Sequence, residues 1–326
     1  MANATISHLG VPNAGEFATA AQRDEMFYKV FAGEVLTAFE ETNVFKPLHM
    51  VRTIDHGKSA EFPRTWKANA RYHDPGTPIL GSNNIAINPV VISVDDLLIA
   101  DVFIYDLEDA KNHFDVRGIF SKQLGDALAR SYDQKLARIA IKAARAQANI
   151  KDGYGGTVLT NAAANTDGEI LASLIFQAAQ TLDEKDVPPS ERYVVLAPEQ
   201  YYLLAQATKV LNKDWNGQGS YAEGSVLKVA GIDIIKSNNL PRTNIAAKVD
   251  GEQNDYTGDF TKNVGVVFHK SCMATVQLIG LATEWSGKDF HIMYQGDLCV
   301  AKMALGHGYL RPEAAVEIAT AAAGGA

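Results

Sequence analysis

Two long stretches of this chain carry apolar residues at helical spacing. Within residues 25–39 they return every three or four positions, with Gly33 as the one interruption. Residues 115–149 keep the same spacing over more than twice that length. This periodicity predicts a helix in each stretch, and the second would extend for roughly 50 Å at 1.5 Å per residue. A helix of that length spans more than an ordinary globular domain requires.

The segment between these helices, residues 53–94, has an unusual composition. It contains four prolines and three glycines around two short strand-like pieces, at 59–62 and 86–93. A connection of roughly forty residues with so little core-forming content is far longer than usual loops. The segment is therefore either disordered or supported by something outside its own domain.

Large aromatic and cationic side chains gather near the start of this segment. They are Phe62, Arg64, Trp66, Lys67, Arg71 and Tyr72. A mobile lid is one interpretation, but a lid rarely carries this many large anchors. We therefore predict an extended two-stranded arm that lies on a neighbouring molecule. All of these residues except Lys67 are predicted to make the intersubunit contact.

The second half of the chain follows an α/β pattern. Thr166 and Glu169 form a capping box, which predicts the start of a helix over residues 169–185. Pro198 predicts the first turn of another helix. Strands are predicted at residues 91–105, 193–196, 232–235, 264–268, 274–279 and 293–305. Residues 2–21 are small and polar, which indicates a loosely anchored arm.

Basic side chains follow the second half of the long helix, with almost no acid near them in the sequence. They are Lys135, Arg138, Lys142 and Arg145. One interpretation is a solvated helix end, where cations suit the helix dipole. The other is a surface that faces phosphates, because the dipole preference is confined to the last turn and does not reach Lys135. Both interpretations are open at this point.

The composition is that of a folded protein with a sizeable core. The 326 residues are 47% hydrophobic, and no run of about 18 apolar residues predicts a membrane span. The first residues lack the basic-then-apolar order of a secretory signal, so a cytoplasmic protein is expected. A formal net charge of −8 disfavours sequence-specific DNA binding by the whole molecule. Cys272 and Cys299 have neither metal-ligand nor disulfide-framework spacing and are expected to be buried thiols.

Motifs for catalysis are incomplete. Residues 57–59, Gly-Lys-Ser, resemble the end of a phosphate-binding loop, but Arg52 stands where its first glycine should be. A loose dinucleotide fingerprint at 217–222 follows polar residues instead of a strand. The acidic pairs 95–96 and 108–109 are better explained by helix dipoles than by acid–base catalysis.

Histidines do not supply a catalytic site either. The eight histidines show no His-x-x-x-His or His-Glu-x-x-His spacing. His307, between two glycines, is expected to be a turn residue with a structural hydrogen bond, because no nucleophile accompanies it. The sequence therefore predicts a protein that is not an enzyme.

Four segments resemble one known family, in order along the chain. They are KVFAGEVLTAF at 29–39, HMVR through GKSAEFP at 49–63, ADVFIYDLEDA at 100–110 and KMALGHGYLRPEAA at 302–315. These segments are similar to the major capsid proteins of T-seven-like podoviruses, which are short-tailed phages. The middle, residues 150–263, resembles the family mainly in layout.

The resemblance implies an α+β fold of the Hong Kong 97 type. Its expected parts are an N-terminal arm at 1–52, an extended E-loop at 53–94, a P-domain at 95–160 with a spine helix at 115–149, an A-domain at 161–285, and a return to the P-domain with the C-terminus at 286–326. No cofactor and no metal are implied.

The same resemblance implies a major capsid protein that self-assembles as hexamers and pentamers into an icosahedral head enclosing double-stranded DNA. Its expected partners are further copies of itself, a scaffolding protein, a portal protein and non-specifically bound DNA, with no membrane. Its expected locations are the virion capsid and, during assembly, the host cytoplasm. An encapsulin-like cage of the same fold is the alternative. A soluble α/β enzyme is a further one, which the incomplete motifs disfavour.

Overall fold

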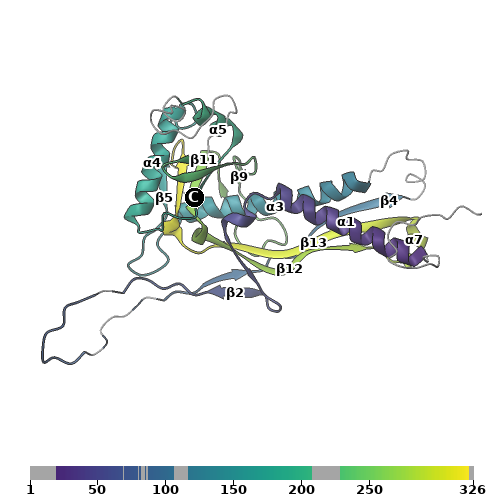
Figure 1. Cartoon of the computed structure of the whole chain (residues 1–326), viewed down its shortest axis with the longest axis horizontal. Coiled ribbons are helices and arrows are strands. Elements are labelled where there is room, and N and C mark those ends of the chain that lie inside the picture. The colour runs from purple at the N-terminus through teal and green to yellow at the C-terminus, as the bar shows by residue number, and fades with distance from the viewer. Residues whose placement is uncertain are drawn as a thin grey trace, which may run out of the picture. The chain divides into compact units, whose positions relative to one another are not determined.

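The computed structural model describes residues 20–68, 70–79, 81, 85, 87–105, 117–207 and 228–322. Contacts within the chain divide it into two compact units. Unit 1 comprises Met1–Asn43, Leu97–Ser131 and Ile279–Met303, and unit 2 comprises Val44–Asp96, Tyr132–Leu278 and Ala304–Ala326. Figure 1 labels many of the helices and strands of both.

Two helices pack closely in unit 1. Its elements are α1 (Ala20–Thr42), the first part of α3 (Arg117–Arg145), β4 (Leu98–Tyr105), α7 (Lys288–Tyr294) and parts of β12 (Met273–Trp285) and β13 (Gly296–Tyr309). A Cβ on Gly125 of α3 would stand 2.6 Å from the Val35 carbonyl oxygen of α1. The absence of a side chain therefore lets the two backbones approach. Ser121 donates a hydrogen bond to Glu34 across the same contact, at 2.9 Å.

A six-stranded sheet forms the centre of unit 2. Its order is β5 (Thr157–Thr160), β14 (Ala315–Ala319), β11 (Asn263–His269), β6 (Arg192–Leu196), β8 (Ile232–Lys236) and β7 (Lys228–Val229). Every residue of β11 is buried, which explains its nearly continuous apolar sequence. Helix α4 (Gly168–Glu184) contacts β5 and β14, and α5 (Pro198–Ala205) contacts α4.

Unit 2 also contains a small hairpin. Its strands β2 (Ser59–Phe62) and β3 (Val90–Ser93) pair antiparallel. The remaining elements of the unit are β1 (Met50–Thr53), β9 (Asn244–Ile245), β10 (Gly258–Asp259), η1 (Lys46–Leu48), η3 (Lys270–Cys272) and η4 (Pro312–Ala314). A four-stranded sheet has the order β1-β12-β13-β4. Helix α3 and strands β12 and β13 contribute residues to both units.

The predicted strands are confirmed in position and corrected in extent. The strand predicted at 59–62 is β2. Its partner, predicted at 86–93, begins at Val90, because Pro89 has no N–H to donate to a ladder. The strand predicted at 91–105 is two strands, β3 and β4. The strand predicted at 293–305 is β13, which starts later and continues to Tyr309, so His307 lies in a strand and not in a turn.

Two helix boundaries also differ from the prediction. Helix α3 ends at Arg145, four residues before Asn149. The N-cap of α4 is Asp167 and not Thr166, because the Asp167 carboxylate accepts from the backbone N–H of Glu169 at 2.8 Å. The predicted arm up to residue 19, the acidic pair 108–109 and the fingerprint at 217–222 lie outside the described residues.

Candidate functional site

The part of the chain that the structure describes offers no cluster of metal ligands. There, no three His, Cys, Asp or Glu side chains could together hold a metal ion. None of the helices in the same ranges is both long and apolar enough to cross a membrane. Cys272 and Cys299 are buried, and burial raises the pKa of the Cys299 thiol to about 12, so it stays protonated at neutral pH.

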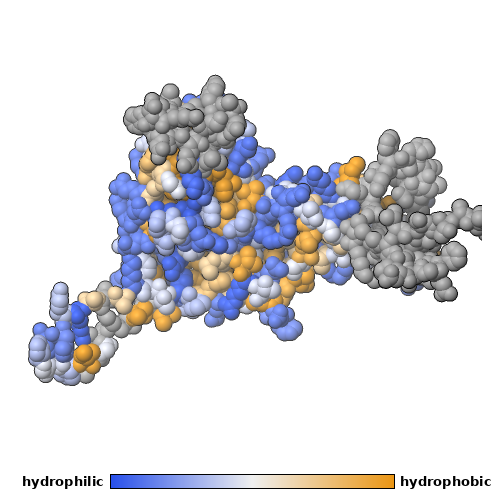
Figure 2. All heavy atoms as spheres, viewed as in Figure 1, coloured by the Kyte–Doolittle hydropathy of each residue, from blue (hydrophilic) through white to orange (hydrophobic). Residues whose placement is uncertain are grey.

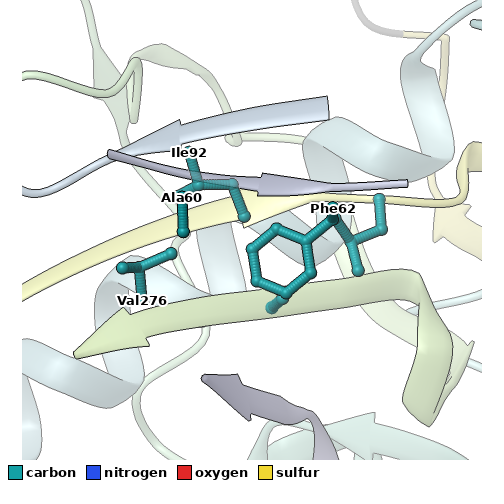
Figure 3. Packing of buried hydrophobic residues seen from close by; sticks show 6 residues of the cluster. Ala60, Phe62, Ile92 and Val276 are labelled. Atoms are coloured by element: carbon teal, nitrogen blue, oxygen red, sulfur yellow. The ribbon is translucent and has the colours of Figure 1, made fainter. Parts of the chain in front are cut away.

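The β2–β3 hairpin is attached to unit 2 by an apolar cluster. In β2 the side chains alternate between exposed and buried, and Ala60 and Phe62 point inward. With Ile92 of β3 they pack against Val276 of β12, as Figure 3 shows. Leu310 and Ala274 complete the cluster. Phe62 is 9% exposed, so the side chain belongs to the apolar core of its own chain, and its intersubunit contact stays a prediction.

Arg64 is likewise held inside its own chain. The side chain is buried, and its guanidinium donates to the Asn149 side-chain oxygen. A second guanidinium nitrogen lies 3.6 Å from Glu313 Oε2, and Glu313 is also buried. Burial lowers the pKa of Arg64, and the charge of Glu313 opposes that effect. Arg64 therefore holds the hairpin within its own chain, and its intersubunit contact stays a prediction.

Beyond Arg64, the connection becomes exposed. The half-buried Trp66 packs its ring edge-on against Tyr154, with 5.7 Å between centroids, and Lys67 pairs with Asp186. All described residues from 70 to 79 are exposed, including Arg71. Tyr72 is fully exposed. This part of the predicted contact set remains available to a partner.

Aliphatic side chains extend this exposed surface. Ile79, Ile85 and Ile87 are 74%, 43% and 66% exposed. Figure 2 shows hydrophobic and hydrophilic side chains mixed on the connection, at the lower left of the view. Exposed apolar side chains in such numbers are typical of a protein-binding surface. We call the described residues 70–79, 81, 85 and 87 the loop surface.

Unit 1 carries a second exposed apolar surface, on β4 and α7. Its residues are Ile99, Phe103, Tyr105, Ile292, Met293 and Tyr294, all at least 40% exposed. Phe290 ties the two elements together, because its ring lies 6.2 Å from that of Phe103 and 4.5 Å from that of Tyr294. This β4–α7 surface was not predicted from the sequence. Its signal was the strand sequence LIADVFIY, in which both faces are apolar apart from Asp101, a pattern typical of a strand that is covered on both faces.

The basic residues of α3 are paired with acids of unit 2. Arg145 donates from Nε and Nη2 to the two carboxylate oxygens of Glu317, each at 2.6 Å. Lys142 donates to the backbone oxygen of Asp255 at 2.9 Å and pairs with its carboxylate. These acids are more than a hundred positions away in the sequence, so a local charge pattern did not reveal them.

The other two cations are enclosed as well. Lys135 Nζ lies 3.4 Å from Asp95 Oδ2 and 3.5 Å from Glu252 Oε1, and its side chain is 14% exposed. Arg138 is half-buried, and burial lowers its pKa while the charge of Glu252 opposes that effect. Acidic side chains therefore compensate Lys135, Lys142 and Arg145, which the local sequence did not reveal. A DNA-facing role of Lys135, Arg138, Lys142 and Arg145 stays a prediction.

Two histidines of unit 2 share one buried hydroxyl. The Phe45 carbonyl accepts from His49 Nδ1 at 2.7 Å, which leaves Nε2 as the acceptor for the Thr275 hydroxyl at 2.7 Å. The same hydroxyl lies 2.8 Å from His307 Nδ1. Burial lowers the pKa of both histidines, that of His49 to about 4. The structural hydrogen bond expected for His307 is confirmed, and Thr275 is fully buried and out of reach of a substrate.

Comparisons with known proteins extend over both units and the loop surface. The family model described as "Gp10A-like: Major capsid protein" matches residues 61–319. The chain is 33% identical to the major capsid protein of Enterobacteria phage T3 over 328 residues, 93% of this chain and 94% of that protein. It is also 33% identical to the major capsid protein of Escherichia phage T7 over 332 residues, with the same two coverages. A solved capsid structure of the cyanophage P-SCSP1u is similar with a TM-score of 0.80 and 43% identity, over 98% of this chain and 99% of that chain.

Proposed function

Since the chain belongs to the Gp10A-like family of major capsid proteins, we propose that it assembles as hexamers and pentamers into an icosahedral head. It is a major capsid protein of a tailed phage, with a fold of the Hong Kong 97 type. The observation that carries the proposal is the loop surface, whose large apolar side chains a single chain leaves in water.

In the proposed contact, the loop surface of one copy lies against the β4–α7 surface of the next copy. Because the two surfaces differ, the contact is heterologous, and heterologous contacts close into rings when the rotation between copies allows it. Trp66, Arg71 and Tyr72 remain as proposed contacts at the loop side. Phe62 and Arg64 position the loop from within their own chain.

A capsid protein also needs partners other than its own copies. We expect a scaffolding protein and a portal protein during assembly in the host cytoplasm, and double-stranded DNA inside the finished head. Contact with DNA would be non-specific and directed at phosphates. It would rest little on Lys135, Lys142 and Arg145 of α3, because acidic side chains already pair with them.

The alternative interpretations lose support. An encapsulin-like cage shares the fold, but the relatives at 33% and 43% identity are phage capsid proteins. For a soluble α/β enzyme, no complete catalytic constellation was found in the sequence, and the family is one of structural proteins.

A double substitution tests the contact. Tyr72→Ala with Ile79→Ala removes two side chains that are 101% and 74% exposed, so the subunit should fold as before. Shell yield should fall at least about tenfold, because apolar anchors carry much of the energy of an interface. Shells are counted by sedimentation and negative-stain microscopy, and subunit folding is followed by circular dichroism.

Two further variants make the test specific. Val249→Ala removes an apolar side chain that is 62% exposed on a polar loop of unit 2, and it should leave the yield unchanged. Met293→Ser, on the β4–α7 surface, should reduce the yield, and its effect should not add to that of the loop variant if the two surfaces meet. Wild-type yields for the loop variant would refute the contact.

A further inference from the structure

The β2–β3 hairpin is held at two places that differ in chemistry. Next to the sheet, Ala60, Phe62 and Ile92 are anchored by apolar packing (Figure 3). Two residues further along, the attachment is polar and centres on Arg64, which Asn149 and Glu313 hold. Apolar packing has no preferred direction, whereas an ion pair and directed hydrogen bonds fix an angle.

Asn88 and Asn149 connect both strands of the hairpin to this polar attachment. The Asn88 side chain donates to the Asn149 backbone oxygen, and the Asn88 backbone N–H donates to the Arg64 carbonyl at 3.1 Å. Asn149 in turn donates to the Leu310 carbonyl at 3.2 Å. The incoming and outgoing strands are thus fixed to the same point of unit 2.

The polar attachment is incompletely satisfied. Arg64 Nε and Glu313 Oε2 are buried and have no hydrogen-bond partner among the described residues. Their ion pair is long, at 3.6 Å, although both side chains are only 5% exposed. A buried polar pair that lacks some of its hydrogen bonds costs free energy, and it is therefore easier to open than a complete network.

Space lies on both sides of the hairpin at this point. A cavity of about 200 Å³ is lined by Trp66, Lys185, Arg311 and Glu313 among others. A wider hollow of about 770 Å³ lies between Ile87, Asn149 and neighbouring residues. Lys185 lines the same cavity as Glu313; burial lowers the Lys185 pKa, and the charge of Glu313 opposes that effect. Glu313 therefore has a second cation at this cavity besides Arg64.

We propose that Arg64, Asn149 and Glu313 form a releasable clamp that sets the direction in which the loop surface leaves the hairpin. When the clamp is closed, the loop surface leaves the hairpin in one direction. When the clamp is open, with Glu313 turned to Lys185, Phe62 still anchors the hairpin, and the loop can move into either hollow. The inference rests on the proposed function, because a loop that serves both pentamers and hexamers must meet its neighbour at more than one angle.

The test replaces the clamp without leaving a buried charge. Arg64→Met with Glu313→Leu substitutes apolar side chains of similar size, a change that is often neutral for folding. In free subunits, the Asn88 amide should exchange its hydrogen at least about fivefold faster than in the wild type, because its acceptor strand is no longer fixed. Exchange in β11 should be unchanged. Shells of the variant should be irregular in size.

Control variants distinguish loss of the clamp from misfolding of the subunit and from loss of the contact between copies. Lys67→Ala with Asp186→Ala removes the exposed ion pair beside the clamp and should change neither readout. If the double apolar variant does not fold, Glu313→Gln takes its place, because it removes the charge and keeps the shape of the side chain. The Asn88 exchange rate is then measured in that variant. Unchanged Asn88 exchange refutes the clamp, whereas faster exchange with regular shells refutes its role in directing the loop and leaves the proposed function intact.

Discussion

Glu317 lies in the middle of β14 and is fully buried, and Arg145 donates hydrogen bonds to both of its carboxylate oxygens. Burial raises the pKa of Glu317, and Arg145 opposes the rise. We predict that Arg145→Gln lowers the free energy of unfolding by about 3 kcal/mol, because it leaves a buried charge without its counter-ion. Urea denaturation of the subunit at neutral pH measures the loss.

Lys142 provides the matched control for Arg145 on the same helix. Its partner Asp255 is 55% exposed in its side chain, so water can replace the lost ion pair. Lys142→Gln should therefore cost less than about 1 kcal/mol. Equal losses at the two positions would contradict the view that Arg145 has a structural role which Lys142 lacks.

The two buried histidines predict a dependence of stability on pH. His49 has its pKa lowered to about 4 by burial, so the unfolded chain binds a proton at higher pH than the folded chain does. Stability is therefore fully present above about pH 6.5 and falls as pH decreases towards 4, by on the order of 3 kcal/mol from this residue. His307 adds in the same direction.

His49→Asn separates this effect from general acid denaturation. The asparagine amide can still donate to the Phe45 carbonyl, but it does not titrate. Urea midpoints measured between pH 7 and pH 4.5 should fall less steeply for the variant than for the wild type, whatever its absolute stability. Parallel pH profiles would show that His49 is not responsible.

At the residue scale, the sequence could reveal which side chains were unusual but not which way they point. Arg64 and Tyr72 both stood out in one cluster, yet one is buried and the other is fully exposed. Arg64 is buried because Glu313 and Asn149 lie opposite it, and these come from distant parts of the chain. A counter-ion far away in the sequence cannot be recognised from the residues around Arg64.

At the scale of the elements, helices α1 and α3 each contain a glycine, and replacing the two glycines by alanine should change stability in opposite directions. Gly33 lies in α1, and a Cβ added there would meet nothing within 4 Å, so Gly33→Ala should stabilise the helix by about 0.5–1 kcal/mol. Gly125 lies in α3, where a Cβ would meet the Val35 oxygen at 2.6 Å and the Ala38 Cβ at 2.8 Å.

Gly125→Ala should therefore lower the melting temperature although alanine is the better helix former. The helices would have to separate, and the loss should exceed about 1 kcal/mol, the lower end for overpacking. Differential scanning calorimetry shows whether each variant melts above or below the wild type. A gain at Gly125 would show that the close approach of α1 and α3 is not required.

Element boundaries could be predicted where one local signal dominated. β2 was predicted at its observed bounds because apolar and polar positions alternate between a glycine and a proline. Helix α7 was missed, since its sequence KDFHIMY is short and its apolar residues Phe290, Ile292 and Tyr294 alternate as in a strand. The cap of α4 was misplaced by one residue because Thr166 and Asp167 are both good caps, and only three-dimensional structure decides between them.

For the whole molecule, the family could be predicted from four sequence segments, whereas the surfaces that the copies would use could not. The loop surface was predicted as an exposed arm, and its apolar side chains are consistent with that. The proposed acceptor, on β4 and α7, was not foreseen. Its residues come from separate segments, Ile99 to Tyr105 and Ile292 to Tyr294, which meet because Phe103 packs on Phe290.

Charge and apolar burial act in opposite directions when the copies associate. Each copy carries a formal net charge of −8, so association brings like charges together. Salt screens this repulsion, with a Debye length of about 10 Å at 0.1 M and about 3 Å at 1 M. The proposed contact at Tyr72, Ile79 and Met293 is apolar, and apolar attraction is not weakened by screening.

We therefore predict that assembly is favoured by salt and by warmth. Raising NaCl from about 0.05 to about 0.5 M should lower the critical subunit concentration for shell formation by roughly tenfold, because the repulsion is screened. Cooling the subunits from about 25 °C to about 5 °C should raise that concentration, because hydrophobic stabilisation weakens in the cold. Light scattering across a dilution series measures both. A critical concentration that rises with salt would mean that ion pairs hold the copies together, and the apolar contact between the loop and β4–α7 surfaces would then be wrong.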